Sequence, residues 1–446
     1  MRALVAVAEL APYVTTGGLG NAVAGLSEAL ARRGHDLTIA VPGYRDIGVT
    51  PGDEPWVELA SHPIRVIAFA DGVFDRPGVY GPEPGTGYED NWLRFGVFTR
   101  AVADLAAGFD VLHLHDAHVA AAALLTPSPT VLTIHNAAHQ MHAPLDAAAL
   151  LLGAPVEATW ATGALEWWEG ANYLKAGIVA ADVVTTVSPT HAVELTVDET
   201  SFGLGGVIRE RPNGIVGILN GIDDRSWDPA ADPTLPKRFS IRRLRARAAC
   251  RAELIAAAGI DDGVVLGNVG RMSFQKGLDL LEPLLAPAIE AGVRLVLVGN
   301  GELDLAVDEW VQAHPGMVAH LPYSEPLARL VSAGVDAYLM PSAFEPSGLG
   351  QLYAMRYGAP PIVHFVGGLA DSVVDLDEDP DEATGFGFRS FTPDALESAI
   401  GRAITTYAER PRVWRALQVR GMTRDWSWDA RAAEYEDVYV RAAAGG

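Results

Sequence analysis

Short runs of apolar residues alternate with amphipathic helical patterns along almost the whole chain. Strands that are buried on both faces, as in a parallel sheet, occur in sequence as such continuous apolar runs. Their alternation with helices is typical of doubly wound α/β layers rather than of β-sandwiches. The predicted strands are 3–8, 37–41, 64–69, 111–115, 130–135, 183–187 and 216–219, followed by 264–270, 294–298, 317–321, 337–340 and 361–365.

Length and proline pattern divide the chain into two predicted domains. At 446 residues the chain exceeds the roughly 150 to 250 residues of one ordinary α/β domain. Between the two series of strands, Pro229, Pro233 and Pro236 precede a basic helical run. Proline punctuation ahead of a charged helix is typical of a domain junction. We therefore predict a boundary near residue 235, which gives domains 1–235 and 236–426.

The charge of the chain limits its partners. A formal net charge of −23 and a pI near 4.8 repel phosphate backbones and anionic lipids at long range, which argues against nucleic acid or a membrane as a partner. A neutral polymer or a small sugar is compatible with this charge. An anionic nucleotide must then be met by local cations, and the oligomeric state is left open.

Cysteine usage and the N-terminal run indicate a cytoplasmic protein. Cys250 is the single cysteine, so it forms no intramolecular disulfide and no multi-thiolate metal site. The apolar run 3–8 ends at Glu9 and is too short for a secretory signal. No apolar run reaches the roughly 18 residues that a membrane-spanning helix needs.

Polar side chains recur where the predicted strands end. Since the carboxyl ends of strands in an open α/β sheet bind ligands, their repetition in both halves favours a ligand site over a series of structural contacts, although any single member has a structural explanation. A metal cluster of His113, His115 and His118 is rejected, because no matching carboxylate or Cys pattern follows. The strand-end residues are His113, His115, Asp116, His118, Thr133, His135, Asn136, Ser188, Asn220, Asp223, Arg271 and Lys276.

The segment from Ala337 to Asp371 carries the strongest chemical signal. It predicts a strand, a turn with Glu345, a helix starting near Gly348, a second strand, and the turn Gly367-Gly368 before a further helix. Helix N-termini present unpaired N–H groups, so this arrangement suits a diphosphate beside a reacting sugar. The chemistry predicted is that of a nucleotide-sugar enzyme.

Two further loops fit the same ligand. Gly17 and Gly18 open a predicted helix, where the missing side chains let a phosphate or sugar approach the backbone, although a plain strand-to-helix turn explains them equally well. Arg271 and Lys276 share one glycine-flanked loop after a strand. Two cations there neutralise a departing diphosphate, the role that metals often take elsewhere. The alternative is a surface salt-bridge pair.

The chain resembles the bacterial glycogen synthase and plant starch synthase family of retaining glycosyltransferases along nearly its whole length. The motifs are short, numerous and in the same order. They are Gly17-Gly-Leu, Asp75-Arg-Pro, Asp90-Asn with Arg94-Phe, His115-Asp with His118, Thr133-Ile-His-Asn, Leu174-Lys-Ala-Gly, Thr186-Val-Ser-Pro, Gly217-Ile-Leu-Asn-Gly-Ile-Asp, Trp227, Arg271 with Gln275-Lys-Gly, Pro341-Ser, Phe344-Glu-Pro, Gly348-Leu, Gln351-Leu-Tyr, Arg356-Tyr-Gly and Gly367-Gly-Leu-Ala-Asp.

The resemblance implies a fold, a reaction and a site. The fold is two Rossmann-like domains facing across a cleft, called GT-B, with a final helix in 427–446 crossing back to the first domain. The reaction is transfer from a nucleotide-activated donor to a saccharide acceptor with retention, without metal or other cofactor. The implied catalytic residues are Glu345, His135, Asp116, Arg271 and Lys276. The implied donor-binding residues are Gly17, Gly18, Arg271, Lys276, Gly299, Tyr323, Ser347, Gly348, Leu349, Gly367 and Gly368. The implied acceptor-side residues are Thr15, Asn21, Asp90, Asn91, Asn136, Trp168 and Asn220.

The chain departs from the family pattern at a few positions. Thr15 stands for a lysine, Asn21 for an acid, and Ser347 for a cysteine. The pair Trp167 and Trp168 is also unusual. Two interpretations are open: the tryptophans pack in the core, or they form a remodelled platform for a sugar.

Three functions are therefore weighed. The first is a glucan synthase that uses a nucleotide glucose. The second is a pseudoglycosyltransferase or specialised enzyme that joins an activated cyclitol or deoxysugar to an amino sugar or other small sugar. The third is a non-catalytic binding protein, which the joint retention of the implied catalytic residues disfavours. Phosphorylases that use pyridoxal phosphate share the architecture, but their cofactor-lysine motif is missing from the sequence.

Overall fold

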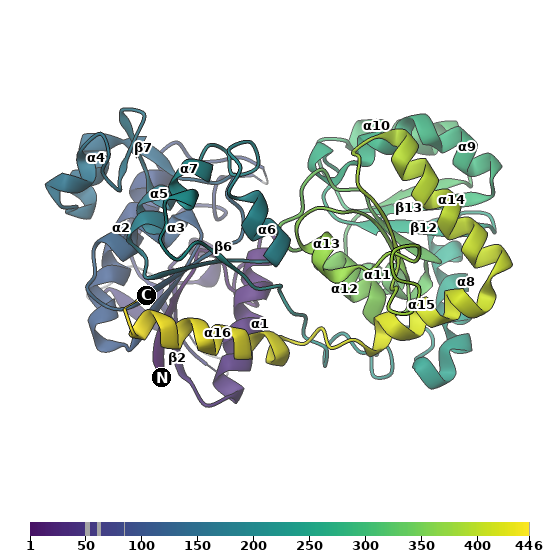
Figure 1. Ribbon diagram of the computed structural model, residues 1–446, viewed down its shortest axis with the longest axis horizontal. Helices are drawn as coiled ribbons and strands as arrows, with labels where there is room; N and C mark the ends of the chain where they lie inside the picture. The colour runs from purple at the N-terminus through teal and green to yellow at the C-terminus, as the bar shows by residue number, and fades with distance from the viewer. Residues whose placement is uncertain (50–53, 60–63, 84, 446) are drawn as a thin grey trace. The chain divides into compact units, whose positions relative to one another are not determined.

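The computed structural model describes residues 1–49, 54–59, 64–83 and 85–445. The chain forms two compact units (Figure 1). Unit 1 comprises Met1–Gly221 and Trp428–Gly446, and unit 2 comprises Ile222–Ser427. The predicted α/β class is confirmed, because each unit is built on a predominantly parallel sheet. No helix within the described ranges is both long and apolar enough to cross a membrane.

Unit 1 contains an eight-stranded sheet in the order β11-β10-β6-β5-β1-β2-β4-β3, in which only β3 is antiparallel to its neighbour. The chain runs outward from β1 in one direction through β2 and then returns to β5 on the other side of β1. The strands are β1 (Arg2–Ala6), β2 (Asp36–Pro42), β3 (Trp56–Leu59), β4 (Arg65–Phe69), β5 (Val111–His115), β6 (Thr130–Ile134), β10 (Val183–Thr186) and β11 (Val216–Gly217).

Helices cover both faces of this sheet. Alternate residues of β1 explain the layers, since Leu4 packs with Phe95 and Phe98 of α2 on one face, whereas Val5 belongs to the core formed with α1 and α16 on the other. The helices are α1 (Gly18–Arg32), α2 (Asn91–Leu105), α3 (Ala117–Ala120), α4 (Leu145–Leu152), α5 (Tyr173–Ala180), α6 (Pro189–Glu194), α7 (Gly205–Arg209) and α16 (Trp428–Ala443), with 3₁₀ turns η1 (Arg45–Ile47), η2 (Gly72–Phe74), η3 (Ala106–Gly108), η4 (Ala121–Leu124) and η5 (Val156–Thr159).

Helix α16 is the C-terminal element and lies in unit 1, beside α1 (Figure 1). Gly25 of α1 makes this approach possible, since a Cβ built there would lie 2.2 Å from Nε1 of Trp428. The structure thus places in unit 1 the segment for which the sequence predicts a returning helix.

A second, three-stranded antiparallel sheet belongs to unit 1, in the order β7-β9-β8. Its strands are β7 (His142–Pro144), β8 (Glu166–Trp167) and β9 (Gly170–Asn172). The sequence analysis missed this sheet, because two- and three-residue strands leave no periodic pattern.

Unit 2 contains a six-stranded, fully parallel sheet in the order β14-β13-β12-β15-β16-β17. Its strands are β12 (Val264–Val269), β13 (Val293–Val298), β14 (Val318–Leu321), β15 (Ala337–Met340), β16 (Pro361–His364) and β17 (Phe386–Phe388). Its helices are α8 (Arg247–Ala258), α9 (Leu285–Glu290), α10 (Asp304–Ala313), α11 (Glu325–Gly334), α12 (Gly350–Arg356), α13 (Gly367–Ser372), α14 (Pro393–Glu409) and α15 (Pro411–Thr423), with η6 (Ile241–Ala246), η7 (Phe274–Lys276) and η8 (Leu278–Leu284).

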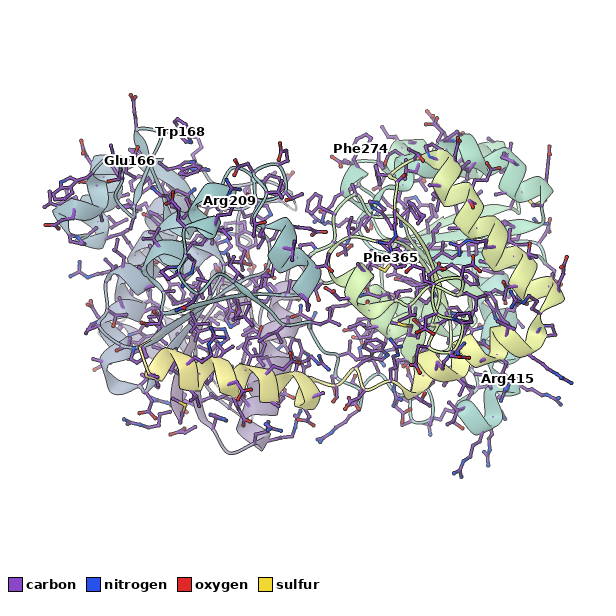
Figure 2. The ribbon with its side chains drawn as sticks, in the orientation of Figure 1. Glu166, Trp168, Arg209, Phe274, Phe365 and Arg415 are labelled. Atoms are coloured by element: carbon purple, nitrogen blue, oxygen red, sulfur yellow. The ribbon has the colours of Figure 1, made fainter. Side chains whose placement is uncertain are left out.

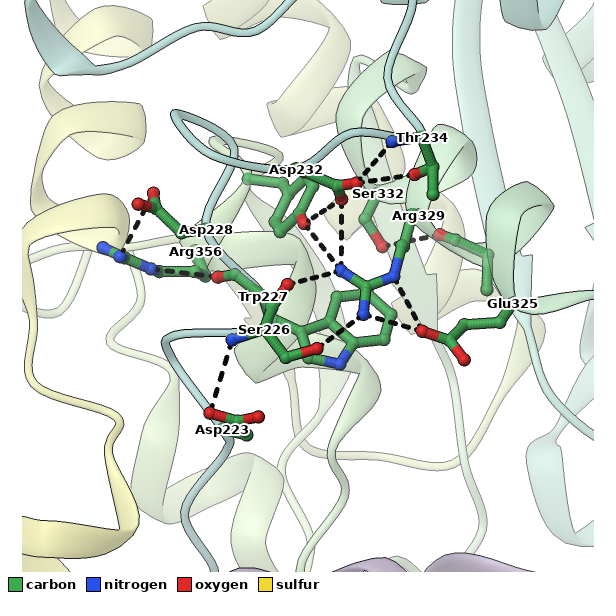
Figure 3. Close-up of polar contacts among 12 residues, drawn as sticks. Asp223, Ser226, Trp227, Asp228, Asp232, Thr234, Glu325, Arg329, Ser332 and Arg356 are labelled. Atoms are coloured by element: carbon green, nitrogen blue, oxygen red, sulfur yellow. Dashed lines mark hydrogen bonds and ion pairs between the residues drawn. The ribbon is translucent and has the colours of Figure 1, made fainter. Parts of the chain in front are cut away.

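The division between the units lies at Gly221 and Ile222, earlier than the predicted boundary near residue 235. The indole of Trp227 stacks on Tyr353 with ring centroids 3.8 Å apart, and the Arg329 guanidinium lies 4.2 Å from the Trp227 ring. Arg329 Nη1 also donates to the backbone oxygen of Ser226 and to Asp232 Oδ2 (Figure 3). These contacts bind the segment before residue 235 to α11 and α12, so it folds as part of unit 2.

Candidate functional site

In each of the two large sheets, the chain switches from building one side to building the other at one pair of neighbouring strands, the place where open α/β sheets bind their ligands. In unit 1 this switch point lies between β1 and β5, and in unit 2 between β12 and β15. The loops after these four strands carry Glu9 and Gly17, Asp116, the Arg271–Lys276 pair, and Glu345. The topology therefore gathers the predicted catalytic residues at the two switch points, with His135 following β6, the neighbour of β5.

The glycine turn of unit 1 is held by a buried carboxylate. Glu9 Oε2 accepts hydrogen bonds from the backbone N–H of Thr16 at 2.6 Å and of Gly17 at 3.3 Å. Glu9 Oε1 accepts from the Thr16 hydroxyl at 2.7 Å and from the Tyr80 hydroxyl at 2.6 Å. The sequence analysis did not identify Glu9 or Tyr80, although an acid directly after the first strand is the same kind of strand-end signal. Gly17 and Gly18 are exposed, and a Cβ built on Gly17 would meet no atom within 4 Å.

Asp116 fixes the loop that carries His135. Its Oδ1 accepts from the backbone N–H of His135 at 2.6 Å and of Asn136 at 3.2 Å. Burial raises the pKa of Asp116 to about 7, and the two N–H donors offset part of this rise. Asp116 has a φ of 60° and a ψ of 179°, a backbone region that residues other than glycine rarely adopt, so the loop holds it in a strained conformation. The carboxyl group thus acts on His135 through the backbone.

Buried histidines form a connected group behind this loop. His115 Nδ1 lies 3.0 Å from His135 Nε2, and His113 bonds Thr133 at 2.7 Å and the Tyr439 hydroxyl of α16 at 3.0 Å. Burial lowers the pKa of His113 and of His135 to about 3, so both are neutral at physiological pH. In the described part of the chain, no group of three or more His, Cys, Asp or Glu side chains is arranged to hold a metal ion.

The contacts of this group favour one tautomer of His135. His115 Nε2 is buried without a hydrogen-bond partner among the described residues. Because a buried unpaired N–H donor is rarer than an unpaired acceptor, the proton of His115 is placed on Nδ1, which then donates to His135 Nε2. His135 consequently carries its own proton on Nδ1, on a side chain that is only partly buried. That N–H is available to a ligand.

The predicted acceptor-side residues separate into two groups. Asp90 forms a bidentate pair with Arg76, with both distances 2.7 Å, and Asn91 bonds the Tyr80 carbonyl and Arg94. These two therefore anchor the loop beside the site. The others differ in their surroundings. Asn136 is partly buried, and its Oδ1 accepts from the Ala138 N–H at 3.0 Å. Thr15 and Asn21 are exposed, Asn220 is buried with Oδ1 unpaired among the described residues, and Trp168 is 84% exposed.

Trp167 and Trp168 have different environments. Trp167 packs against the main core of unit 1, with Lys175 Nζ 5.7 Å from its ring. Trp168 lies at the tip of the β8–β9 hairpin and points an exposed indole outward from unit 1 (Figure 2). Trp167 therefore packs in the core, whereas Trp168 does not.

In unit 2, the two switch-point loops meet. Lys276 Nζ lies 2.6 Å from Glu345 Oε2, which also accepts from the Ser342 hydroxyl at 3.0 Å. Gln275 connects the loops further, since its backbone oxygen accepts from Ala343 at 2.9 Å and its side-chain oxygen accepts from Arg271 at 3.2 Å. Lys276 and Glu345 are therefore in direct contact, and Arg271, which is exposed, is connected to them through Gln275, so the Arg271–Lys276 loop is not a detached surface pair.

The glycine pair after β16 packs against the Glu345 loop. Gly367 has a φ of 42°, and a Cβ there would lie 2.1 Å from the carbonyl oxygen of Glu345. A Cβ on Gly368 would lie 2.0 Å from the carbonyl oxygen of Ser347. Side chains are excluded at both positions, so the first N–H groups of α13 stay next to the start of α12. Ser347 is buried, and its hydroxyl has no hydrogen-bond partner among the described residues.

The remaining predicted donor residues surround these loops in sequence order. Gly348 and Leu349 directly precede α12 and are partly buried. Gly299 is buried after β13, and its carbonyl oxygen lies 2.9 Å from His320 Nε2. Tyr323 follows β14 and is 61% exposed. All of them lie after the carboxyl ends of strands of the same parallel sheet.

Two Rossmann-like units, with a carboxylate and paired cations at the switch point of the second, define the class of GT-B glycosyltransferases. Comparison with known proteins agrees. Residues 2–210 match the family described as starch synthase catalytic domain, and residues 251–416 match glycosyl transferases group 1. A glycogen synthase of Alkalilimnicola ehrlichii is 39% identical over 98% of both chains. Glycogen synthase 2 of Agrobacterium fabrum is 39% identical over 98% of this chain and 92% of its own.

Solved structures give the same result. The catalytic domain of starch synthase IV from Arabidopsis thaliana, bound to ADP and acarbose, matches with a TM-score of 0.87 and 28% identity over 99% of both chains. Sucrose-phosphate synthase from Thermosynechococcus elongatus shares the fold, with a TM-score of 0.65 and 20% identity over 100% of both chains. The chain belongs to the glycogen synthase and starch synthase family, and it is a glycosyltransferase of the glycogen-synthase type.

Proposed function

We propose that the chain transfers a glucosyl-type group from a nucleotide-activated donor to a hydroxyl group of an α-1,4-glucan or a small saccharide, in the cytoplasm. The single observation that carries the proposal is the 2.6 Å contact between Lys276 Nζ and Glu345 Oε2 at the switch point of unit 2. It pairs a cation suited to a diphosphate with a carboxylate suited to a cationic sugar. The glycogen synthase relatives and the ADP bound to Arabidopsis starch synthase IV support the donor class.

In this proposal, unit 2 binds the donor. Arg271 and Lys276 neutralise the diphosphate as its charge develops, beside the backbone of the Gly367-Gly368 turn. Glu345 stabilises the positive charge that builds up on the sugar. These cations supply the charge that a metal ion supplies in other enzymes, so we propose transfer that requires no metal ion or other cofactor.

Unit 1 would contribute contacts to the reacting sugar and to the acceptor. His135 offers a neutral N–H donor, and Asp116 sets its position through the backbone. The bond between the anomeric carbon and the diphosphate oxygen breaks, and the acceptor oxygen bonds to the same face of that carbon. The departing phosphate oxygen takes the acceptor proton, so configuration is retained and no side chain serves as the base.

One observation favours a second candidate, a pseudoglycosyltransferase or specialised small-molecule enzyme. Thr15 and Asn21 are both exposed at the start of α1 and both uncharged, and the first turn of α1 contains no acid. The family places a lysine and an acid at these positions. An enzyme that uses a different donor or acceptor would no longer need these two charges.

The test is release of nucleoside diphosphate from ADP-glucose and UDP-glucose, with and without glycogen or maltose, in the presence of EDTA. The proposal predicts acceptor-dependent release that EDTA does not abolish, and an α-configured product by NMR. If both donors stay inert with every acceptor, glucan synthesis is excluded. Activated cyclitols and deoxysugars with amino-sugar acceptors then test the second candidate.

A further inference from the structure

The tip of the β8–β9 hairpin presents a tryptophan to solvent. Trp168 is 84% exposed, more than any other Phe, Tyr or Trp side chain among the described residues. Figure 2 shows it with Glu166 at the periphery of unit 1, on the small sheet that also contains β7 in Figure 1. An indole has a large, rigid apolar face, so an exposed one offers a surface on which a ligand ring can stack.

The backbone of this tip is strained. Trp167 pairs with Gly170, so Trp168 and Glu169 form a two-residue hairpin loop. Their φ values are 49° and 67°. A loop with positive φ at both central residues strongly prefers Asn-Gly or a similar pair, because a side chain with Cβ is disfavoured there. Strain of this kind, kept at an exposed position, indicates function at that position.

Polar contacts keep the tip rigid. The backbone N–H of Glu169 donates to Glu166 Oε1 at 3.0 Å, which closes the turn. Lys175 Nζ, whose side chain is buried, donates to the carbonyl oxygens of Gly163 and Glu166 at the base of the hairpin. The indole of Trp168 is therefore presented on a preformed support, and binding to it orders little further backbone.

The chemistry around the indole selects the ligand. Glu166 and Glu169 flank Trp168, so phosphates and other anions are repelled. Carboxylates accept hydrogen bonds from hydroxyl groups, and an aromatic face packs against the C–H face of a pyranose ring. A neutral carbohydrate meets both requirements, whereas an apolar protein segment offers the two carboxylates no further hydrogen-bond donor.

We propose that the tip of the β8–β9 hairpin is a carbohydrate-binding platform that stacks Trp168 on a sugar ring of an α-glucan chain. It lies on the small sheet, apart from the strand ends that carry His135 and Asp116. The platform holds the polymer to the enzyme between transfer events. The inference rests on the proposed function only for the identity of the polymer.

The experiment measures retention of the full chain in native gels that contain glycogen, alongside the ratio of KM for glycogen to KM for maltotriose. Trp168→Ala is expected to weaken retention by roughly three- to tenfold and to raise the KM ratio by a similar factor. Trp168→Phe is expected to keep part of the retention. Trp160→Ala, which alters another exposed tryptophan of unit 1, is the matched control and is expected to keep it all.

A relaxed hairpin separates binding from folding. Trp168→Asn combined with Glu169→Gly supplies the preferred turn residues, so its Tm is expected to rise while retention falls. Unchanged retention in Trp168→Ala, or equal loss in Trp160→Ala, overturns the proposal, and so does a fall in Tm of the relaxed variant. Nucleoside diphosphate release with maltotriose reports on the proposed function alone. Trp168-dependent retention without any release would therefore uphold the platform and refute the glucan synthase.

Discussion

Lys276 Nζ lies 2.6 Å from Glu345 Oε2, and the two residues follow the adjacent strands β12 and β15 of unit 2. Glu345→Gln keeps the shape of the side chain but removes its charge, so kcat is expected to fall about 10²-fold or more with a small change in donor KM. Lys276→Met is expected to raise donor KM as well, because it removes the cation proposed to meet the diphosphate. Steady-state kinetics with the active donor measures both.

Another ion pair of unit 2 provides the control. Arg389 Nη2 lies 2.6 Å from Glu378 Oε1, but both side chains are more than half exposed. An exposed pair contributes about 0–1 kcal/mol to stability. Glu378→Gln is therefore expected to leave kcat, donor KM and Tm unchanged within error. A kinetic loss in this control equal to that of Glu345→Gln would contradict a specific role for the Lys276–Glu345 pair.

Asp116 makes stability depend on pH. Burial raises its pKa from 3.8 to about 7, so the folded state binds a proton more tightly than the unfolded state does. This contribution to stability is complete below pH 3.8, and it is lost as pH rises to about 7. Asp116→Asn keeps an acceptor for the N–H groups of His135 and Asn136 and does not titrate. It is expected to match the wild type near pH 4 and to exceed its stability at pH 8 by on the order of 2–4 kcal/mol.

Urea unfolding of the two proteins at a series of pH values measures this difference. The neutral buried histidines, such as His113 and His135, lower the stability of the folded state as pH falls below about 6.5. Because both proteins contain them, this effect cancels in the stability difference. A constant stability difference between pH 4 and pH 8 would show that Asp116 is ionised throughout. The kinetic effect of Asp116→Asn on transfer is a separate measurement at each pH.

The sequence predicted the long buried strands, because their apolar runs are continuous and each is followed by a turn or a helix start. Elements set by tertiary packing were missed. β17 (Phe386–Phe388) was missed because it has only three residues and follows an acidic loop. The boundary was placed near residue 235 because prolines precede a charged helix there. The stacking of Trp227 between Arg329 and Tyr353, which decides that boundary, joins residues about a hundred positions apart and leaves no local pattern.

For the candidate site too, the sequence located the residues that follow long strands but not the contacts between distant loops. The positions of Asp116, His135 and Lys276 follow from strand ends, which the alternating pattern locates. Glu9 was missed because its role depends on the path of the turn back to Thr16 and on Tyr80, a residue from a distant loop. Asp90 was assigned to the acceptor side, and its pairing with Arg76 became visible only in three dimensions.

Trp227 provides a test of the unit boundary. Trp227→Ala removes the stacking on Tyr353 and the contact with Arg329, so unit 2 is expected to lose about 2–4 kcal/mol of stability. Differential scanning calorimetry or urea unfolding measures the loss. Trp160→Ala, at a position 57% exposed, is the control and is expected to change stability by less than about 0.5 kcal/mol. Equal effects of the two substitutions would argue that the segment before residue 235 does not stabilise unit 2.

Gly17 and Gly367 are both glycines of predicted ligand loops, but they differ in why a side chain is absent. A Cβ on Gly17 would meet no atom within 4 Å, whereas a Cβ on Gly367 would lie 2.1 Å from the Glu345 carbonyl oxygen. Gly17→Ala is therefore expected to keep Tm and to raise the KM of donor or acceptor, because its methyl group projects into open space. Gly367→Ala is expected to lower Tm by several degrees. Thermal unfolding and kinetics distinguish them, and full activity of Gly17→Ala would indicate that no ligand approaches this turn.

Thr15 and Asn21 offer a gain-of-function test of the substrate. Both side chains are exposed at the start of α1, so replacing them with Lys and Asp is expected to leave Tm unchanged. The double variant Thr15→Lys, Asn21→Asp restores the family's charges, and a charged phosphate contact contributes about 1.5–3 kcal/mol. Transfer from nucleotide glucose is then expected to rise about tenfold or more in kcat/KM relative to the unaltered chain. Glu28→Gln, which alters a partly exposed charged side chain later in α1, is the control. An increase confined to the double variant assigns the changed substrate preference to the lost charges, and equal rates in all three proteins would refute that account.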